Sequence, residues 1–329
     1  MRRPPECRGR ASSFSVQAVT SRAARGCALV LTGLAFACSV AAAARAASSD
    51  RAIKACLLAR TTPAPKLVVY GSSRAEKLEP AYLGSLLHET AFNASVSAGT
   101  PDDVWAFAHL AHDQAGQKPV RALWLLDLES LRPHPFDASL LQAPVLARYF
   151  SATFGPAPET PHGLAPTTCS FTTSPLTHYA ADGFRARDFH DAAAAHGMTL
   201  ARGVQLAITD YRRIYRTGYP RVEPQEVAWV ARTIRAFNSW GVRPVIVLTP
   251  VQPAFMQALG PDGWNQRHAD VLKALRALGG RFTLLDASSI ATFGGSPKDF
   301  YDGVHMRVAN TRRLAAWIAQ HARGDLTGR

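Results

Sequence analysis

The chain has 329 residues, of which 47% are hydrophobic and 19% are charged, and its formal net charge is +13. This composition excludes a disordered protein and provides enough apolar material for one large globular domain or two small ones. Six of the thirteen net positive charges lie in residues 1–46, which carry seven arginines and one glutamate. No nucleic-acid partner is predicted, because no basic run is interleaved with aromatic residues and no zinc-finger spacing occurs. A positive surface can instead attract anionic envelope polymers or phospholipids.

Residues 1–46 are predicted to be a signal peptide or a membrane anchor. An arginine-rich start precedes an apolar run over residues 26–44, and Ala44-Arg45-Ala46 is typical of a signal-peptide cleavage site. The apolar run is also about long enough for one uncleaved span with its positive end inside. We therefore expect export to the periplasm, the cell surface or the outer side of the membrane. The sequence leaves cleavage open.

Export changes what the cysteines imply. Three of the five cysteines lie in the leader, which leaves Cys56 and Cys169 in the exported part. In an oxidising compartment these two residues can form a disulfide, and two buried free thiols are the alternative. Residues 47–65 are predicted to be a linker to a globular domain over residues 66–329.

The first predicted strand of that domain covers residues 67–70 and ends abruptly at Gly71-Ser72-Ser73. A helix-compatible stretch follows from Glu76. A turn between a buried parallel strand and a helix lies at the carboxyl edge of the sheet, where a helix N-terminus stabilises developing negative charge. Such a turn suits a nucleophile, although the same turn can also be an ordinary connection.

Strands and helices alternate through the rest of the chain. Further strands are predicted within residues 90–101 and at 120–128, 244–249 and 281–286, and helices at 104–115, 224–240, 264–278 and 308–321. This alternation predicts an α/β fold with a five-stranded parallel sheet covered on both faces. A proline-rich insertion after the third strand, about residues 133–222, contains a helical patch at 189–196. It is either a lid or binding element over the site or an excursion without a role there.

A compact polar motif, Asp302-Gly303-Val304-His305, precedes the last predicted helix. An aspartate and a histidine three residues apart on a turn can face one cleft. There the imidazole can accept a proton from a serine while the carboxylate orients the ring. An isolated motif of this kind can also be a surface turn or half of a metal site. No metal site is predicted, because no other His, Cys or Glu cluster has ligand spacing.

Three segments together resemble the conserved blocks of the SGNH, or GDSL-like, hydrolases: Gly71-Ser72-Ser73, the stretch from Asn93 to Thr100, and Asp302-Gly303-Val304-His305. The resemblance covers most of residues 66–321 apart from the insertion, and it implies a flavodoxin-like three-layer α/β/α fold. It also implies that Ser73 is the nucleophile, His305 the general base and Asp302 the residue that orients it. The backbone N–H of Ser73 would bind the oxyanion together with that of Ala98 or Gly99.

The sequence differs from the conserved motifs of the SGNH hydrolases at several positions. Ser72 replaces the Asp of the Gly-Asp-Ser turn, and Ala98 replaces a glycine whose backbone donor survives the change. The family's third-block Asn is absent, because the third strand ends in Asp127-Leu128-Glu129. Loss of one oxyanion donor costs roughly 10²–10³ in rate. We expect the carboxylates of Asp127 and Glu129 either to orient a substrate hydroxyl or amine or only to cap and solvate the end of the strand.

Other polar residues are weaker candidates. Arg74 follows the predicted nucleophile and is expected either to bind an anionic substrate or to form a salt bridge near Glu76. His268 at the start of a helix and the stretch Asp210-Tyr211-Arg212-Arg213 in the insertion either line the cleft or are a helix cap and a surface pair.

The Gly-Ser-Ser turn and the leader resemble the exported branch of the family. That branch includes the D-alanyl transfer protein of lipoteichoic acid and the alginate O-acetylation proteins. The prediction is an exported serine esterase or O-acyltransferase acting on an acyl ester of an envelope glycan, polymer or lipid, without a cofactor. The alternative is a catalytically weak or inactive envelope binding or assembly protein of the same fold that partners a membrane acyltransferase.

Overall fold

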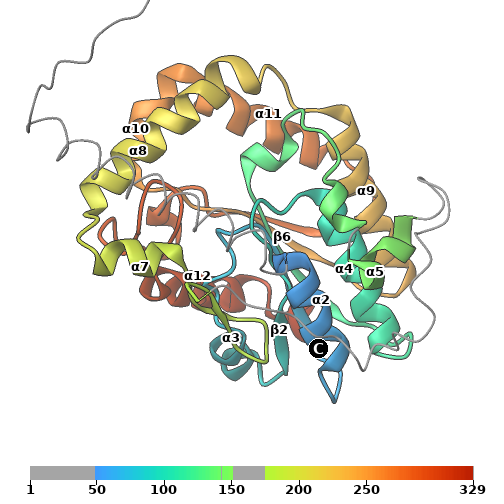
Figure 1. Ribbon diagram of the computed structural model, residues 1–329. Helices are drawn as coiled ribbons and strands as arrows, with labels where there is room; N and C mark the ends of the chain where they lie inside the picture. Colours follow the sequence, from blue (N-terminus) through green and yellow to red (C-terminus); the bar gives the residue numbers. More distant parts are fainter. Residues whose placement is uncertain (1–48, 142, 151–174, 329) are drawn as a thin grey trace, which may run out of the picture. The chain divides into compact units, whose positions relative to one another are not determined.

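The computed structural model describes residues 49–141, 143–150 and 175–328. A sheet of five parallel strands in the order β2-β1-β3-β6-β7 lies at its centre, with helices packed around it (Figure 1). The strands are β1 (Leu67–Gly71), β2 (Ala91–Asn93), β3 (Arg121–Leu126), β6 (Val245–Leu248) and β7 (Thr283–Asp286). The predicted α/β class and the five-stranded parallel sheet are therefore confirmed.

Alternate residues of each strand point into two separate cores. On β1, Val68 and Tyr70 pack into the core beneath one helical layer, and Leu67 and Val69 into the core beneath the other. Apolar residues on both faces of a strand are expected where a parallel sheet is covered on both sides. The result is a three-layer α/β/α arrangement.

Each layer uses helices from distant parts of the chain. The first layer contains α2 (Asp50–Arg60), α4 (Pro101–Gln114), α9 (Pro224–Ser239) and α11 (Asn265–Arg276). The second contains α3 (Pro80–Leu87), α12 (Val308–His321) and α13 (Arg323–Thr327). The helix predicted at residues 308–321 has these bounds in the structure, and the helices predicted at 104–115, 224–240 and 264–278 differ from α4, α9 and α11 by at most three residues at either end.

Two segments next to the sheet's carboxyl edge differ from the predicted elements. Residues 73–77 form turns, and α3 starts only at Pro80, since proline is favoured in the first turn of a helix. The strand predicted within residues 90–101 is limited to β2, because residues 94–100 form the loop that leads into α4. Both differences lengthen the loops that surround the candidate site.

The stretch predicted to be a linker, residues 47–65, instead contains α2. Ser49 caps this helix by accepting a hydrogen bond from the N–H of Ala52. Its Arg51 side chain donates to both carboxylate oxygens of Asp103 at 2.6 and 2.8 Å. Lys54 is completely buried and donates to the carbonyl of Asn93 at 2.9 Å. Two charged residues of this stretch thus fasten α2 to the domain.

The N-terminal predictions are only partly within the described residues. Cys56, on α2, is disulfide-bonded, and its partner lies outside the described ranges. Its predicted pairing with Cys169 therefore stays a prediction, and so does the leader at residues 1–46. Within the described part of the chain, no helix is long and apolar enough to cross a membrane.

The insertion between β3 and α9 forms several short elements. They are α5 (Pro144–Ala147), the antiparallel pair β4 (His178–Tyr179) and β5 (Arg185–Arg187), α7 (Phe189–Ala195) and α8 (Leu200–Arg213), followed by a wider helical turn at Ile214–Gly218. After β6 the chain forms α10 (Pro253–Leu259), which packs against α8 (Figure 1).

Short 3₁₀ helices also occur at Leu128–Leu131, Ala138–Leu140, Arg148–Phe150 and Ile290–Phe293. The insertion reaches the side of the sheet where β1 and β3 end, because Tyr211 contacts Arg74 and Tyr215 donates to Glu129 there.

Candidate active site

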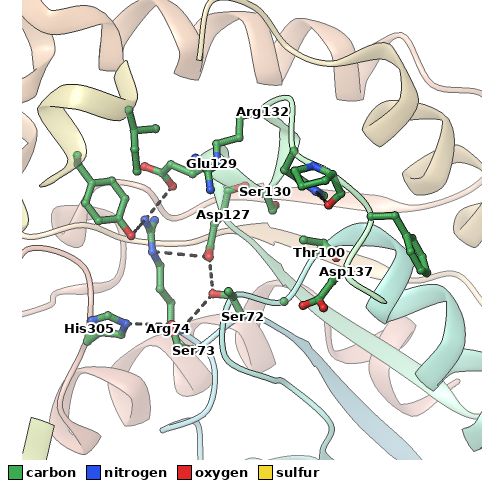
Figure 2. A pocket seen from close by; sticks show the side chains of 17 residues that line it. Ser72, Ser73, Arg74, Thr100, Asp127, Glu129, Ser130, Arg132, Asp137 and His305 are labelled. Atoms are coloured by element: carbon green, nitrogen blue, oxygen red, sulfur yellow. Dashed lines mark hydrogen bonds and ion pairs between the residues drawn. The ribbon is translucent and has the colours of Figure 1, made fainter. Parts of the chain in front are cut away.

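The predicted nucleophile, base and orienting acid lie next to one another. Ser73 Oγ is 2.9 Å from His305 Nε2, and His305 Nδ1 is 2.8 Å from Asp302 Oδ2. Ser73 follows β1, whereas the other two residues precede α12 (Figure 2 shows Ser73 and His305). Segments more than 220 residues apart in the chain thus form a hydrogen-bonded Ser-His-Asp chain.

The turn that carries the aspartate and histidine is fixed by its own backbone. Asp302 Oδ1 accepts hydrogen bonds from the N–H groups of Val304 and His305, both at 2.8 Å. This leaves Oδ2 for the imidazole. Gly303 is required there because a Cβ would lie 2.3 Å from the ring of Phe255.

The serine turn depends on two glycines that approach each other. A Cβ on Gly71, whose φ is +151°, would lie 2.6 Å from the Leu125 carbonyl oxygen on β3. A Cβ on Gly99 would lie 2.5 Å from the carbonyl oxygen of Gly71. These close backbone contacts bring the loop after β2 against the end of β1.

Ala98 has a backbone conformation that glycine adopts more freely than alanine. Its φ is +52°, in the left-handed region that residues with a Cβ rarely occupy. Among the described residues, the N–H groups of Ser73 and Ala98 donate to no protein acceptor, whereas the N–H of Gly99 donates to the Val96 carbonyl at 3.0 Å. Of the two predicted alternatives, Ala98 therefore has the available oxyanion donor.

Burial and charge set the protonation of the two acid–base residues. Burial raises the pKa of Asp302, but hydrogen bonds from His190 and His305 outweigh it and hold that pKa well below its usual range. Burial lowers the pKa of His305, Asp302 raises it, and the positive charges of His190 and Arg74 lower it again. The net pKa of His305 is below its ordinary value. A neutral imidazole beside a carboxylate is the protonation state that a general base needs.

Ser72 differs from Ser73 in its surroundings. Its side chain is buried, donates to Asp127 Oδ2 and accepts from the N–H of Arg74 at 3.2 Å. Asp127 also accepts from the Thr249 hydroxyl at 2.8 Å. With its hydroxyl bound to a carboxylate and with no histidine beside it, Ser72 is a structural member of the turn.

Arg74 belongs to the same buried network. Its guanidinium donates to Glu129 Oε2 at 2.8 Å and lies 3.7 Å from Asp127, and Figure 2 shows the side chain extending toward Glu129. The predicted salt bridge near Glu76 is wrong, because Glu76 is paired with Arg185. Two carboxylates already neutralise Arg74, so the alternative that it binds an anionic substrate has little support.

These residues line a cavity of about 490 Å³. Its lining includes Ser73, His305, Ala98 and Gly99. Figure 2 shows Ser73 and His305 at one end of this group of side chains and the residues after β3, such as Glu129 and Arg132, further along it. The insertion contributes Tyr211 and Ile214, together with residues of the segment 132–137. The volume of the cavity is sufficient for a small ester together with part of its alcohol group.

His190 is the residue that sequence reasoning missed. It lies on α7 of the insertion, where its ring packs on that of His305 with centroids 4.1 Å apart. Its Nε2 is 3.4 Å from Asp302 Oδ2. The only signal was that His190 opens the alanine-rich helical patch of the insertion, and nothing in its spacing connects it to Asp302.

His190, Asp302 and His305 also have nitrogen and oxygen donors within 4.8 Å of one another. However, His305 Nδ1 and Asp302 Oδ2 are only 2.8 Å apart. A tetrahedral zinc with bonds of about 2.0–2.1 Å would separate its ligand atoms by roughly 3.3 Å. The observed spacing fits a hydrogen-bonded triad better than a zinc site.

Of the remaining weaker candidates, Tyr211 lines this cavity, whereas His268 and Asp210 do not. His268 Nε2 is 2.9 Å from Asp286 Oδ2 and 3.1 Å from the Ser288 hydroxyl. Both partners contact the same ring nitrogen, so this cluster lacks the relay of a Ser-His-Asp triad, in which opposite nitrogens are used. Asp210 is exposed on α8.

Comparison with known proteins adds no family to this description. A scan against protein-family models finds no match to the chain, and a search of curated proteins finds none either. Any conclusion about function therefore depends on the geometry of the site.

Proposed function

We propose that this protein is an exported serine esterase or O-acyltransferase of the SGNH type, acting on an acyl ester of an envelope glycan, polymer or lipid. The observation that carries the proposal is the chain of contacts Ser73 Oγ–His305 Nε2–Asp302, at 2.9 and 2.8 Å, in a cavity beside the available backbone donors. Export comes from the predicted leader, and the acyl group and its acceptor are not specified by these contacts.

The proposed reaction has two stages. Because His305 Nδ1–H donates to Asp302, Nε2 is free to accept the proton of Ser73 as its oxygen attacks the ester carbonyl. The N–H groups of Ser73 and Ala98 stabilise the oxyanion. The tetrahedral intermediate then breaks the bond to the alcohol oxygen, which takes the proton from His305 and leaves an acyl-Ser73 ester.

In the second stage an acceptor completes the cycle. A water molecule or an acceptor hydroxyl loses its proton to His305 Nε2 and attacks the acyl-Ser73 carbonyl. When the new intermediate collapses, Ser73 oxygen leaves and regains the proton from His305. If the acceptor is water, the product is a carboxylic acid. If the acceptor is a sugar or polymer hydroxyl, the product is a new ester. Hydrolysis and transfer thus use the same residues.

The test compares two adjacent serines. Ser73→Ala should lower the rate of p-nitrophenyl acetate hydrolysis by roughly 10⁴ or more, and His305→Ala should do the same. Ser72→Ala is the matched variant and should retain measurable turnover, because its hydroxyl is bound to Asp127. Wild-type-like turnover in Ser73→Ala and His305→Ala would eliminate the mechanism. Loss in Ser72→Ala alone would assign the nucleophile to the other serine.

One observation favours the binding-protein alternative. Asp127 and Glu129 follow β3, and their carboxylates accept hydrogen bonds from Ser72, Thr249, Arg74 and Tyr215. Among the described residues that line the cavity, none has a side-chain amide that could replace the third oxyanion donor of the SGNH hydrolases. A fluorophosphonate probe distinguishes the two proposals. Labelling of the wild type that disappears in Ser73→Ala supports the enzyme. A folded wild type that is not labelled and does not hydrolyse the ester supports a partner of a membrane acyltransferase.

A further inference from the structure

A second histidine shares the carboxylate of the candidate triad. His190 Nε2 is 3.4 Å from Asp302 Oδ2, the same oxygen that lies 2.8 Å from His305 Nδ1. The other nitrogen of His190, Nδ1, is 3.5 Å from Asp188 Oδ1. His190 therefore lies between two carboxylates, with one ring face toward His305.

The helix that carries His190 is tied to both segments of the candidate triad. Asp188 caps α7 by accepting from the N–H groups of His190 and Asp191. Lys77, in the turns after Ser73, donates to Asp191 at 2.5 Å and lies 3.6 Å from Asp188. The hydroxyl of Tyr301, next to Asp302, also donates to Asp191. The position of His190 is thus fixed relative to both Ser73 and His305.

The charges around His190 favour its protonated form. Burial lowers its pKa, but Asp188 and Asp302 more than offset the burial and raise that pKa to about 9. The other groups that face it are His305 and the ring of Tyr301. Lys77 and Arg185 lie 3.6 and 4.0 Å from Asp188 Oδ2, and the positive charge of Arg74 acts on His305. At neutral pH, His190 is therefore a cation beside a neutral His305.

We propose that His190 is a positioning residue of the catalytic machinery. Its Nε2–H helps to hold Asp302 Oδ2, the oxygen that His305 also contacts, and its positive charge disfavours a second positive charge on His305. The ring of His305 is thereby kept neutral and oriented toward Ser73. This inference rests on the proposed function for its kinetic consequences, but the effect on the charge of His305 does not require turnover.

The first experiment measures pH profiles. His190→Ala should lower kcat for p-nitrophenyl acetate about tenfold, by analogy with the loss of a hydrogen-bonding partner behind a metal ligand. It should also move the acidic midpoint of kcat/KM to higher pH, because His305 loses a cationic neighbour. His190→Gln retains an N–H donor without the charge, so it should recover part of kcat but not the midpoint. His196→Ala, an exposed residue at the end of the same helix, should change neither.

The second experiment separates this inference from the proposed function. In a Ser73→Ala background, NMR titration of the His305 ring should give a higher midpoint when His190 is replaced by Ala, whether or not the protein is an enzyme. An unchanged midpoint in a variant whose circular dichroism matches the wild type would overturn the inference. An inactive wild type with the expected NMR shift would refute the esterase and leave the His190–His305 coupling standing.

Discussion

Replacing Arg74 with methionine should destabilise the protein strongly. The Arg74 side chain is 3% exposed, and its two carboxylate partners, Glu129 and Asp127, have side chains that are 9% and 10% exposed. Methionine preserves most of the side-chain volume but leaves both carboxylates buried without a counter-charge. Breaking a buried pair by removing one partner costs about 3–5 kcal/mol. For a domain of this size that lowers Tm by roughly 6–20 °C.

The measurement is thermal unfolding followed by circular dichroism at pH 7. Arg312→Met is the matched control, because Arg312 forms a comparable pair with Glu79 at the surface, with its side chain 53% exposed. An exposed pair contributes about 0–1 kcal/mol, so this control should change Tm by roughly 4 °C at most. Combining Arg74→Met with Glu129→Gln should recover part of the loss, since one of the two unpaired charges is removed.

A Tm for Arg74→Met within 2 °C of the wild type would refute this reasoning. It would mean that water or another cation compensates the carboxylates. Arg74 would then be available again as a residue for an anionic substrate.

Three further predictions concern the loops at the carboxyl edge and the base. Ala98→Gly should raise Tm by about 2–4 °C, because it relieves the strain of a φ of +52°. The rate of ester hydrolysis should stay within about twofold of the wild type, because the backbone donor is kept. A lower Tm would contradict the assigned strain. Gly99→Ala should lower both Tm and activity, because its Cβ would lie 2.5 Å from the Gly71 carbonyl oxygen. Gly279→Ala should lower neither, because its Cβ would have nothing within 4 Å. Equal Tm values for the two variants would contradict the clash at Gly99. For the wild type, kcat/KM should fall on acidification with a midpoint below pH 6.5, since the lowered pKa keeps His305 neutral to lower pH. A midpoint above 7 would contradict the lowered pKa of His305.

The sheet could be predicted because its signal is local. β1 is a run of apolar residues ended by a glycine, and α12 has apolar residues at helical spacing, so both have nearly the predicted bounds. α2 could not be predicted in this way. Its stability depends on contacts with distant residues, such as Arg51 with Asp103 and Lys54 with Asn93, and no local pattern reveals them.

The same distinction holds in the candidate site. Ser73, Asp302 and His305 could be predicted as site residues because each belongs to a motif of at most four residues that itself indicates the chemistry. His190 and the partners of Arg74 could not. Whether His190 reaches Asp302 depends on where the insertion places α7, and whether Arg74 faces a ligand or a carboxylate depends on the register between β1 and β3.

Two residues at which the sequence differs from the SGNH motifs, Ser72 and Asp127, contact each other in the structure. Ser72 stands where the family has an aspartate, and Asp127 lies at the end of the strand from which the family's asparagine is missing. In the structure the Ser72 hydroxyl donates to Asp127, so a carboxylate is still present in this part of the turn, but it comes from β3. Each change accommodates the other, since an aspartate at both positions would place two carboxylates in hydrogen-bond contact. Under the proposed SGNH-type function, the Ser72–Asp127 contact accounts for both departures together, and the lack of an asparagine alone is weak evidence against activity.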